Sequence, residues 1–208
     1  MATNLNIAVL VSGGGTTLRN LVACIARREL EASVKLVIGS RAGLAAEQRA
    51  AEAGVLYEVV ARRQFVSIEA FSERVFALIE QAGVDLVVLG GGLCPPRGPG
   101  RWPRRGMDNP PAVLAPLRGR GVYGHFVHEA VLAHGCKVSG CTVHFVDNTY
   151  DTGPIISQLV CDVRDDDTPQ TLAARVFEQE CLAYPQAIRD FAAGRLKIVG
   201  RRVIRQSV

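Results

Sequence analysis

A polar loop between two apolar segments is the part of this sequence best suited to chemistry. Residues 139–158 read SGCTVHFVDNTYDTGPIISQ and contain three titratable side chains, His144, Asp147 and Asp151, and the hydrogen-bonding amide of Asn148. The flanking apolar residues predict two strands, and a loop between strands places polar groups beside a buried sheet edge, where catalytic groups commonly lie. The same residue types also build turns without any chemical role.

A glycine-rich turn is the second candidate site. Residues 9–18 read VLVSGGGTTL, which predicts a strand, a tight turn and the start of a helix. The N–H groups of Gly15, Thr16 and Thr17 would then lie at a helix N-terminus, which attracts anions such as phosphate. The spacing is not GxGxxG and no acidic residue ends the next strand at Ile38, so a single phosphate is favoured over a dinucleotide. Many α/β proteins carry such turns and bind nothing there.

Length and composition exclude several classes of protein. The chain has 208 residues with 48% hydrophobic and 21% charged residues, which suits one α/β domain spanning residues 1–208. The net charge of +4 is too diffuse to indicate a nucleic-acid partner. No apolar run is long enough for a membrane span and no signal-peptide pattern is present, so we expect a cytoplasmic protein with no membrane partner.

The metal-binding and disulfide-forming side chains show no organised spacing. The six cysteines are scattered without a CxxC motif, so we expect no metal site and free, mostly buried thiols. His125 and His128 could share one helix face, but only Glu129 lies near them as a further ligand.

Strand and helix patterns alternate in the first half of the chain. Apolar runs predict strands, and 3.6-residue periodicity predicts helices between them; the strands are expected at residues 6–11, 34–38, 56–60 and 85–89, and the helices from the glycine turn to about residue 28, at 43–53 and at 68–82. This alternation predicts a Rossmann-like three-layer sandwich, with a mostly parallel central sheet and helices on both faces.

The pattern breaks at residues 90–121, which hold most of the chain's ten prolines. Only residues 112–115 suggest a regular element there. After this segment, the residue pattern predicts a helix at 126–134 and the two strands that flank the polar loop. The first of these strands is expected to include Val146.

The last predicted helix begins at Thr168 as N-cap, with Pro169 in its first turn. One stripe of this helix is apolar except for Glu180, which would need a partner or a path to water. Pro185 should kink or split the helix.

Together these residues resemble the phosphoribosylglycinamide formyltransferase family over nearly the whole chain. The run VHFVDNTYDTGPI is similar to folate-dependent formyltransferases in general, and the segment AARVFEQECLAYPQAIRDFAAGRLKI to the glycinamide ribonucleotide branch. The resemblance implies transfer of a formyl group from 10-formyltetrahydrofolate to the amine of glycinamide ribonucleotide in purine biosynthesis. It also implies no metal and a monomer or homodimer.

The resemblance also implies roles for individual residues. The catalytic residues would be Asn109, His144 and Asp151. The substrate would lie on Gly14, Gly15, Thr16, Thr17 and Glu180. The folate would contact Gly91, Leu93, Val146, Asp147 and Asp151. We therefore expect the glycine turn to face the loop around Asp151.

The chain departs from the family at one catalytic position. The family pattern Asn-x-His-Pro aligns with Asn109, and its His then falls on Pro111, which has no donor. Residues 92–96 and Ile68 also differ from the family pattern. Three accounts compete: a shifted reading frame or sequence error over about residues 92–120, a catalytically dead relative that still binds ligand, or replacement of the His by His125 or His128.

Two other functions compete with this reading. One is a formyltransferase that acts on a nucleotide sugar or on methionyl-tRNA, although such relatives usually carry a further C-terminal domain. The other is a phosphoribosyl- or folate-binding protein without catalytic activity.

Overall fold

The computed structural model describes residues 4–91, 105–111, 125–147 and 152–207. The chain splits into two compact units: unit 1 comprises Met1–Asp108 with Phe145–Gly153, and unit 2 comprises Asn109–His144 with Pro154–Val208. The expected single domain stays a prediction. The predictions made for Leu93, Asp151 and residues 112–115 lie outside the described residues.

Unit 1 contains a parallel sheet. Its strands follow the order β3-β2-β1-β4-β5, and they are β1 (Leu5–Val11), β2 (Ala32–Gly39), β3 (Leu56–Val59), β4 (Leu86–Leu89) and β5 (Gly106–Asp108). All four residues of β4 are buried, and six of the seven in β1 are too. Strands this apolar are typical of a parallel sheet covered on both faces.

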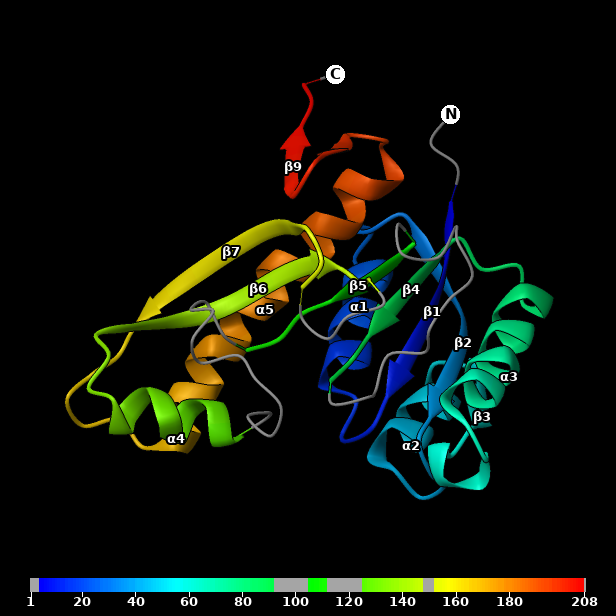
Figure 1. Ribbon diagram of the computed structural model, residues 1–208, viewed down its shortest axis with the longest axis horizontal. Helices are drawn as coiled ribbons and strands as arrows, with labels where there is room; N and C mark the ends of the chain where they lie inside the picture. The colour runs from blue at the N-terminus through cyan, green and yellow to red at the C-terminus, as the bar shows by residue number, and fades with distance from the viewer. Residues whose placement is uncertain (1–3, 92–104, 112–124, 148–151, 208) are drawn as a thin grey trace. The chain divides into compact units, whose positions relative to one another are not determined.

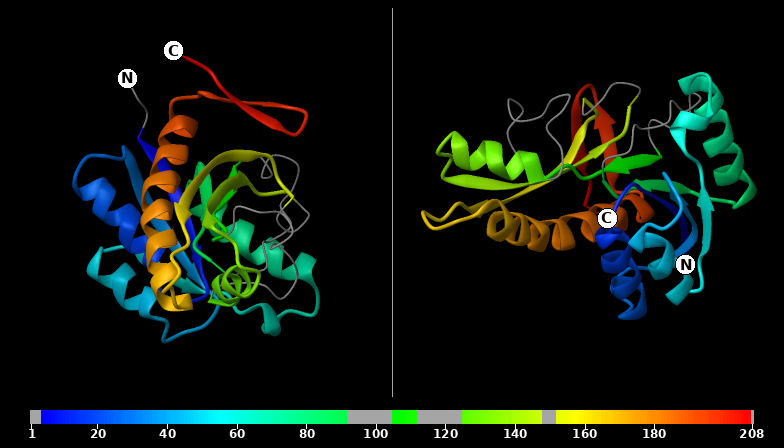
Figure 2. Two further views of the ribbon diagram at one scale, coloured as in Figure 1. Left: turned by 90° about the vertical axis from the view of Figure 1, so that its left-hand side faces the viewer. Right: turned by 90° about the horizontal axis from the view of Figure 1, so that it is seen from below.

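Helices cover both faces of this sheet. They are α1 (Thr16–Ala26), α2 (Ala45–Glu52) and α3 (Ile68–Gln81), with the short 3₁₀ helix η1 (Arg62–Gln64) before α3. Since crossovers between parallel strands are right-handed, α1 and α2 lie on one face and α3 on the other, as Figure 2 shows. The side chains of Phe71, Val75 and Ile79 of α3 pack into the core against the sheet.

The connections change direction between β1 and β4. From β1 the chain moves outward through β2 to β3, and it then returns past β1 to form β4. In open α/β sheets, the carboxyl ends of the two strands at such a reversal flank the ligand-binding crevice. The glycine turn that follows β1 and the residues that follow β4 are therefore placed where a ligand is expected.

Unit 2 is built from a hairpin and a long helix. Its elements are α4 (His125–Ala133), β6 (Val138–Phe145), β7 (Ile155–Asp162), α5 (Pro169–Ala192), β8 (Leu196–Val199) and β9 (Arg202–Arg205), with the strands in the order β6-β7-β9-β8. β6 and β7 are antiparallel, and α5 packs along β7 and against α4 (Figure 1).

The start of α5 is as the sequence predicts. Thr168 is the N-cap, its hydroxyl accepts from the Thr171 amide at 3.2 Å, and the Thr171 hydroxyl accepts from the Thr168 amide at 2.9 Å. This reciprocal pair satisfies two amide donors at the helix start.

Two predictions about the strands are wrong. β5 lies within residues 90–121, where only 112–115 were expected to be regular; a three-residue strand carries no pattern of its own and forms because β4 pairs with it. Val146 lies just beyond β6 and donates its amide to the Gly106 carbonyl at 2.8 Å. The hairpin β8–β9 was not predicted.

The helix is not split at Pro185, since α5 runs from Pro169 to Ala192 as one helix, and a kink at Pro185 stays a prediction. Pro185 removes one helical hydrogen bond, but it is buried, as are Tyr184 and Ala187 on either side of it. Tertiary packing holds the helix together across it.

Near the helix end, the buried Asp190 carboxylate accepts from Arg195 Nε at 3.0 Å and pairs with Arg205 at 2.5 Å, which fastens the C-terminal hairpin to α5.

Candidate functional site

The glycine turn forms an uncapped helix start. Gly15 is the N-cap of α1 with φ 69° and ψ 36°, a left-handed conformation that glycine adopts without strain, and no side chain caps the helix. A β-carbon at Gly15 would lie 2.7 Å from that of Ala46 in α2, so the close packing of α2 also requires glycine. Thr16 is exposed and Thr17 partly exposed. The turn thus presents the first amides of α1 as donors for an anion.

The residues after β4 lie against this turn. The Ser12 hydroxyl donates to the Gly91 carbonyl at 2.6 Å. A β-carbon added at Gly90 would lie 3.6 Å from the Thr17 β-carbon and 3.2 Å from the Leu10 carbonyl oxygen. At the carboxyl ends of β1 and β4, unit 1 therefore brings Gly90 next to Thr17, expected to contact substrate, and Gly91, expected to contact folate, next to Ser12.

The start and end of the polar loop meet in unit 1. The Thr152 hydroxyl is 2.9 Å from Asp147 Oδ2 and 3.0 Å from Oδ1, so it links the two sides of the loop. Val146 packs against the unit 1 core and pairs with Gly106 of β5, the neighbour of β4. Asp151 itself lies outside the described residues, so its expected position facing the glycine turn stays a prediction.

Unit 2 holds the remaining predicted residues. The Thr142 amide of β6 donates to the Pro110 carbonyl at 3.2 Å, which places the Asn109–Pro110–Pro111 segment beside the strand. His144 is two residues further along β6, is 2% exposed, and lies where the pairing with β7 shifts register. Asn109 and His144, which the sequence analysis named as catalytic, are thus carried by neighbouring backbone segments.

Glu180 lies midway along α5 and is partly buried. Burial raises the pKa of the Cys141 thiol in β6 to about 12, and the negative charge of Glu180 adds to that rise. Glu180 therefore lies near Cys141 of β6, the strand that also carries His144. Of the predicted site residues that the structure describes, those of the glycine turn, Gly91, Val146 and Asp147 belong to unit 1, and Asn109, His144 and Glu180 belong to unit 2.

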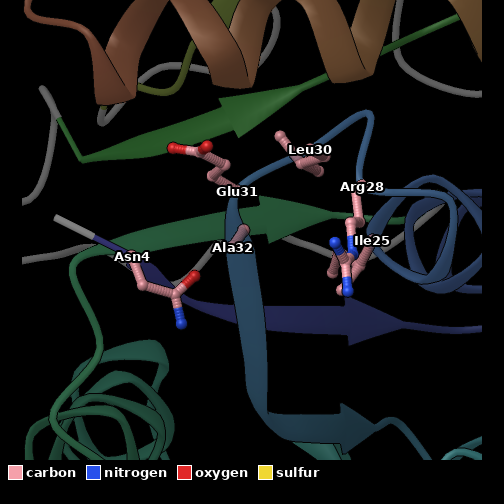
Figure 3. Close-up of a pocket in the computed structure, with 6 residues that line it drawn as sticks. All are labelled: Asn4, Ile25, Arg28, Leu30, Glu31 and Ala32. Carbon is pink, nitrogen blue, oxygen red and sulfur yellow. The ribbon is translucent and has the colours of Figure 1, made fainter. Parts of the chain in front are cut away.

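The described part of the chain also has a shallow depression of about 390 Å³ away from these groups. Asn4, Arg28 and Glu31 are among the residues that line it (Figure 3). It lies at the amino ends of β1 and β2, where Leu5 pairs with Ala32. That is the edge opposite the glycine turn, so the depression is not part of the predicted site.

Of the five described cysteines, only Cys24 and Cys141 are buried, so the expectation of mostly buried thiols is wrong for Cys136, Cys161 and Cys181. His128 is 4% exposed within α4.

Among the described residues, no three His, Cys, Asp or Glu side chains gather in a way that could hold a metal ion. No described helix has both the length and the apolar character required to cross a membrane.

Three residues that take part in these sites were not predicted from the sequence. Ser12 and Thr152 make the two hydrogen bonds described above, and Arg49 of α2 donates from Nη1 to the Gly14 carbonyl. Thr152 could have been found from its place beside Asp151 in the loop. Arg49 gives no such signal, since an arginine on a short polar helix ordinarily faces solvent.

The parallel sheet, the glycine turn at the reversal point and the helices on both faces define an α/β protein of the Rossmann-like class. Residues 5–188 match the profile of the formyl transferase family, and the chain belongs to that family. The expected fold class is thereby confirmed, since solved structures of the family share it.

Individual relatives agree with this assignment. The crystal structure of glycinamide ribonucleotide transformylase 1 from Symbiobacterium toebii has 36% sequence identity to this chain. The superposition covers 98% of this chain and 94% of that protein, with a TM-score of 0.90. The chloroplastic phosphoribosylglycinamide formyltransferase of Arabidopsis thaliana is 31% identical over 92% of the chain. The trifunctional purine biosynthetic protein adenosine-3 of Gallus gallus is 33% identical over 92% of the chain. The chain spans 66% of the plant relative's length and 19% of the avian one's.

Proposed function

We propose that this chain transfers the formyl group of 10-formyltetrahydrofolate to the amine of glycinamide ribonucleotide, in purine biosynthesis. The single observation that carries the proposal is the 36% identity to a glycinamide ribonucleotide transformylase over almost the full length of both chains. The uncapped glycine turn beside Gly91 supports it, because a phosphorylated substrate and a second ligand can meet at that edge of the sheet.

In the proposed reaction, the substrate amine attacks the formyl carbon, and a tetrahedral oxyanion forms. The amine nitrogen loses a proton, the bond from that carbon to the folate nitrogen breaks, and the leaving folate nitrogen takes up a proton, so that tetrahydrofolate is released. Asn109 is proposed to donate to the oxyanion, and fixed donors of this kind are worth on the order of 10²–10³ in rate. His144 and Asp151 are proposed to orient the groups that move the proton.

The binding residues complete the proposal. The turn Gly14–Gly15–Thr16–Thr17 holds the substrate phosphate, and Glu180 holds another part of the substrate. Gly91, Leu93, Val146, Asp147 and Asp151 are proposed to contact the folate. The cytoplasmic location and a monomeric or homodimeric state also remain proposals.

We further propose that turnover is low, because Pro111 stands where the family resemblance expects a proton-transferring histidine. Proline has neither a side-chain donor nor an N–H. The remaining groups still bind and align both ligands, so some transfer persists.

Calorimetry and a formyl-transfer assay on the full chain test these proposals separately. Binding of glycinamide ribonucleotide and of a folate, with slow transfer between them, is the expected result. Binding of neither ligand would overturn the function. Turnover at about 10 s⁻¹, typical of enzymes, would overturn only the low rate, whereas binding of both without any transfer would indicate a non-catalytic binding protein.

A further inference from the structure

Helix α2 approaches the glycine turn with two side chains one helical turn apart. Ala46 packs against Gly15, where a β-carbon would come within 2.7 Å of it, and Arg49 donates from Nη1 to the Gly14 carbonyl oxygen. Residues three apart lie on one helix face, so a single face of α2 both supports the turn and bonds to it.

The hydrogen bond from Arg49 sets the direction of one peptide unit. In a trans peptide the carbonyl oxygen and the following N–H point in opposite directions. Because Arg49 holds the Gly14 carbonyl toward α2, the Gly15 N–H is turned away from α2. Without this bond, the carbonyl of the glycine-rich turn could rotate toward the ligand side and present a negative dipole to an anion.

The positive charge of Arg49 also remains beside the turn. Helix α2 has two acidic side chains, and each has another hydrogen-bonding partner: Glu47 accepts from the Gly43 amide at 2.7 Å, and Glu52 accepts from Gln48 at 2.8 Å. Arg49 as a whole is partly buried, and its guanidinium group bonds to the exposed Gly14. A cation in this position adds to the positive end of the α1 dipole.

We infer that Arg49 is a positioning residue for the phosphate of the substrate. It fixes the Gly14–Gly15 peptide so that its amide faces the phosphate, and its charge strengthens the attraction. This inference rests on the proposed function, because it assumes that the turn binds a phosphorylated substrate.

Calorimetry on the 208-residue chain tests the inference with two ligands. Arg49→Gln should weaken binding of glycinamide ribonucleotide by about tenfold, the usual size of a lost charge-assisted hydrogen bond. Binding of 10-formyltetrahydrofolate, which carries no phosphate, should change less than twofold. If Arg49 had only a structural role, Arg49→Gln would weaken the binding of both ligands by a similar factor. That outcome would overturn the inference.

Two further variants serve as controls. Arg49→Lys keeps a charged donor and should restore most of the affinity, which also keeps the test valid if Arg49→Gln folds poorly. Arg74→Gln removes the same charge from an exposed position on α3, on the opposite face of the sheet, and should bind as the wild type does.

The results separate the two proposals. If wild-type protein does not bind glycinamide ribonucleotide, the proposed function fails and the inference fails with it. If the wild type binds it and Arg49→Gln binds it within twofold, only the role of Arg49 is overturned.

Discussion

Gly15 and Ala46 pack so closely that a β-carbon on the glycine would lie 2.7 Å from that of the alanine. This contact joins the first turn of α1 to α2, and it fixes the glycine turn independently of any ligand. The turn is therefore preorganised, and its amides need little rearrangement to bind an anion.

Gly15→Ala should destabilise the protein by about 2–4 kcal/mol, because it adds a strained positive φ to a steric clash. It should also weaken binding of glycinamide ribonucleotide. Urea denaturation measures the first effect and calorimetry the second. Gly13→Ala is the matched control: its β-carbon would meet nothing within 4 Å, so its stability should change by less than about 0.5 kcal/mol. Equal effects at the two positions would contradict the packing argument.

Pro111→His should raise the rate of formyl transfer by roughly 10²–10⁴-fold, the usual contribution of a general acid or base. The assay is turnover with saturating glycinamide ribonucleotide and 10-formyltetrahydrofolate. Pro110→His places the same imidazole one residue away and should not raise the rate. An unchanged rate in Pro111→His, with both ligands still bound, would show that position 111 is not aligned for proton transfer.

Asp167 should make stability depend on pH at the start of α5. Arg175 binds its carboxylate in a bidentate pair, with distances of 2.7 and 2.8 Å, and these hydrogen bonds hold the pKa of Asp167 well below its usual range. Because the folded pKa is the lower one, this stabilisation is complete above the unfolded value of about 4 and is lost as the pH falls through the folded value.

Asp167→Asn should therefore lower the melting temperature at pH 7, and the difference from wild type should shrink progressively below about pH 4. Thermal denaturation monitored by circular dichroism between pH 2.5 and 7 measures this. Asp165→Asn is the control, because the pair of Asp165 with Lys137 is exposed and such pairs contribute little. A difference that grows toward low pH would have the wrong sign for a lowered pKa.

Cys141 should resist alkylation in the native protein. Burial raises its pKa to about 12, so at pH 8 roughly one thiol in ten thousand is ionised, and the side chain is fully buried. Iodoacetamide labelling followed by peptide mass spectrometry should show Cys136, which is partly exposed, modified long before Cys141. Both should react fully in denaturant. Equal native labelling of the two would contradict the burial of Cys141.

Local signals in the sequence predicted much of the fold. The apolar runs that became β1, β2, β3 and β4, the periodicity of α3 and the cap at Thr168 all depend on residues within a few positions of one another, so they are readable before folding. The family resemblance placed the candidate residues on these elements, but it could not test their roles.

The sequence by itself determined the order and type of most elements, because hydrophobic spacing and capping act over one or two turns of chain. Only the tertiary structure decided that β5 exists, that α5 continues through Pro185, that Ser12 bonds to Gly91 and that Arg49 bonds to Gly14. Each of these depends on partners distant in sequence or on burial by the rest of the fold. Such contacts form only after chain segments are brought together, and no local pattern of residue types records them.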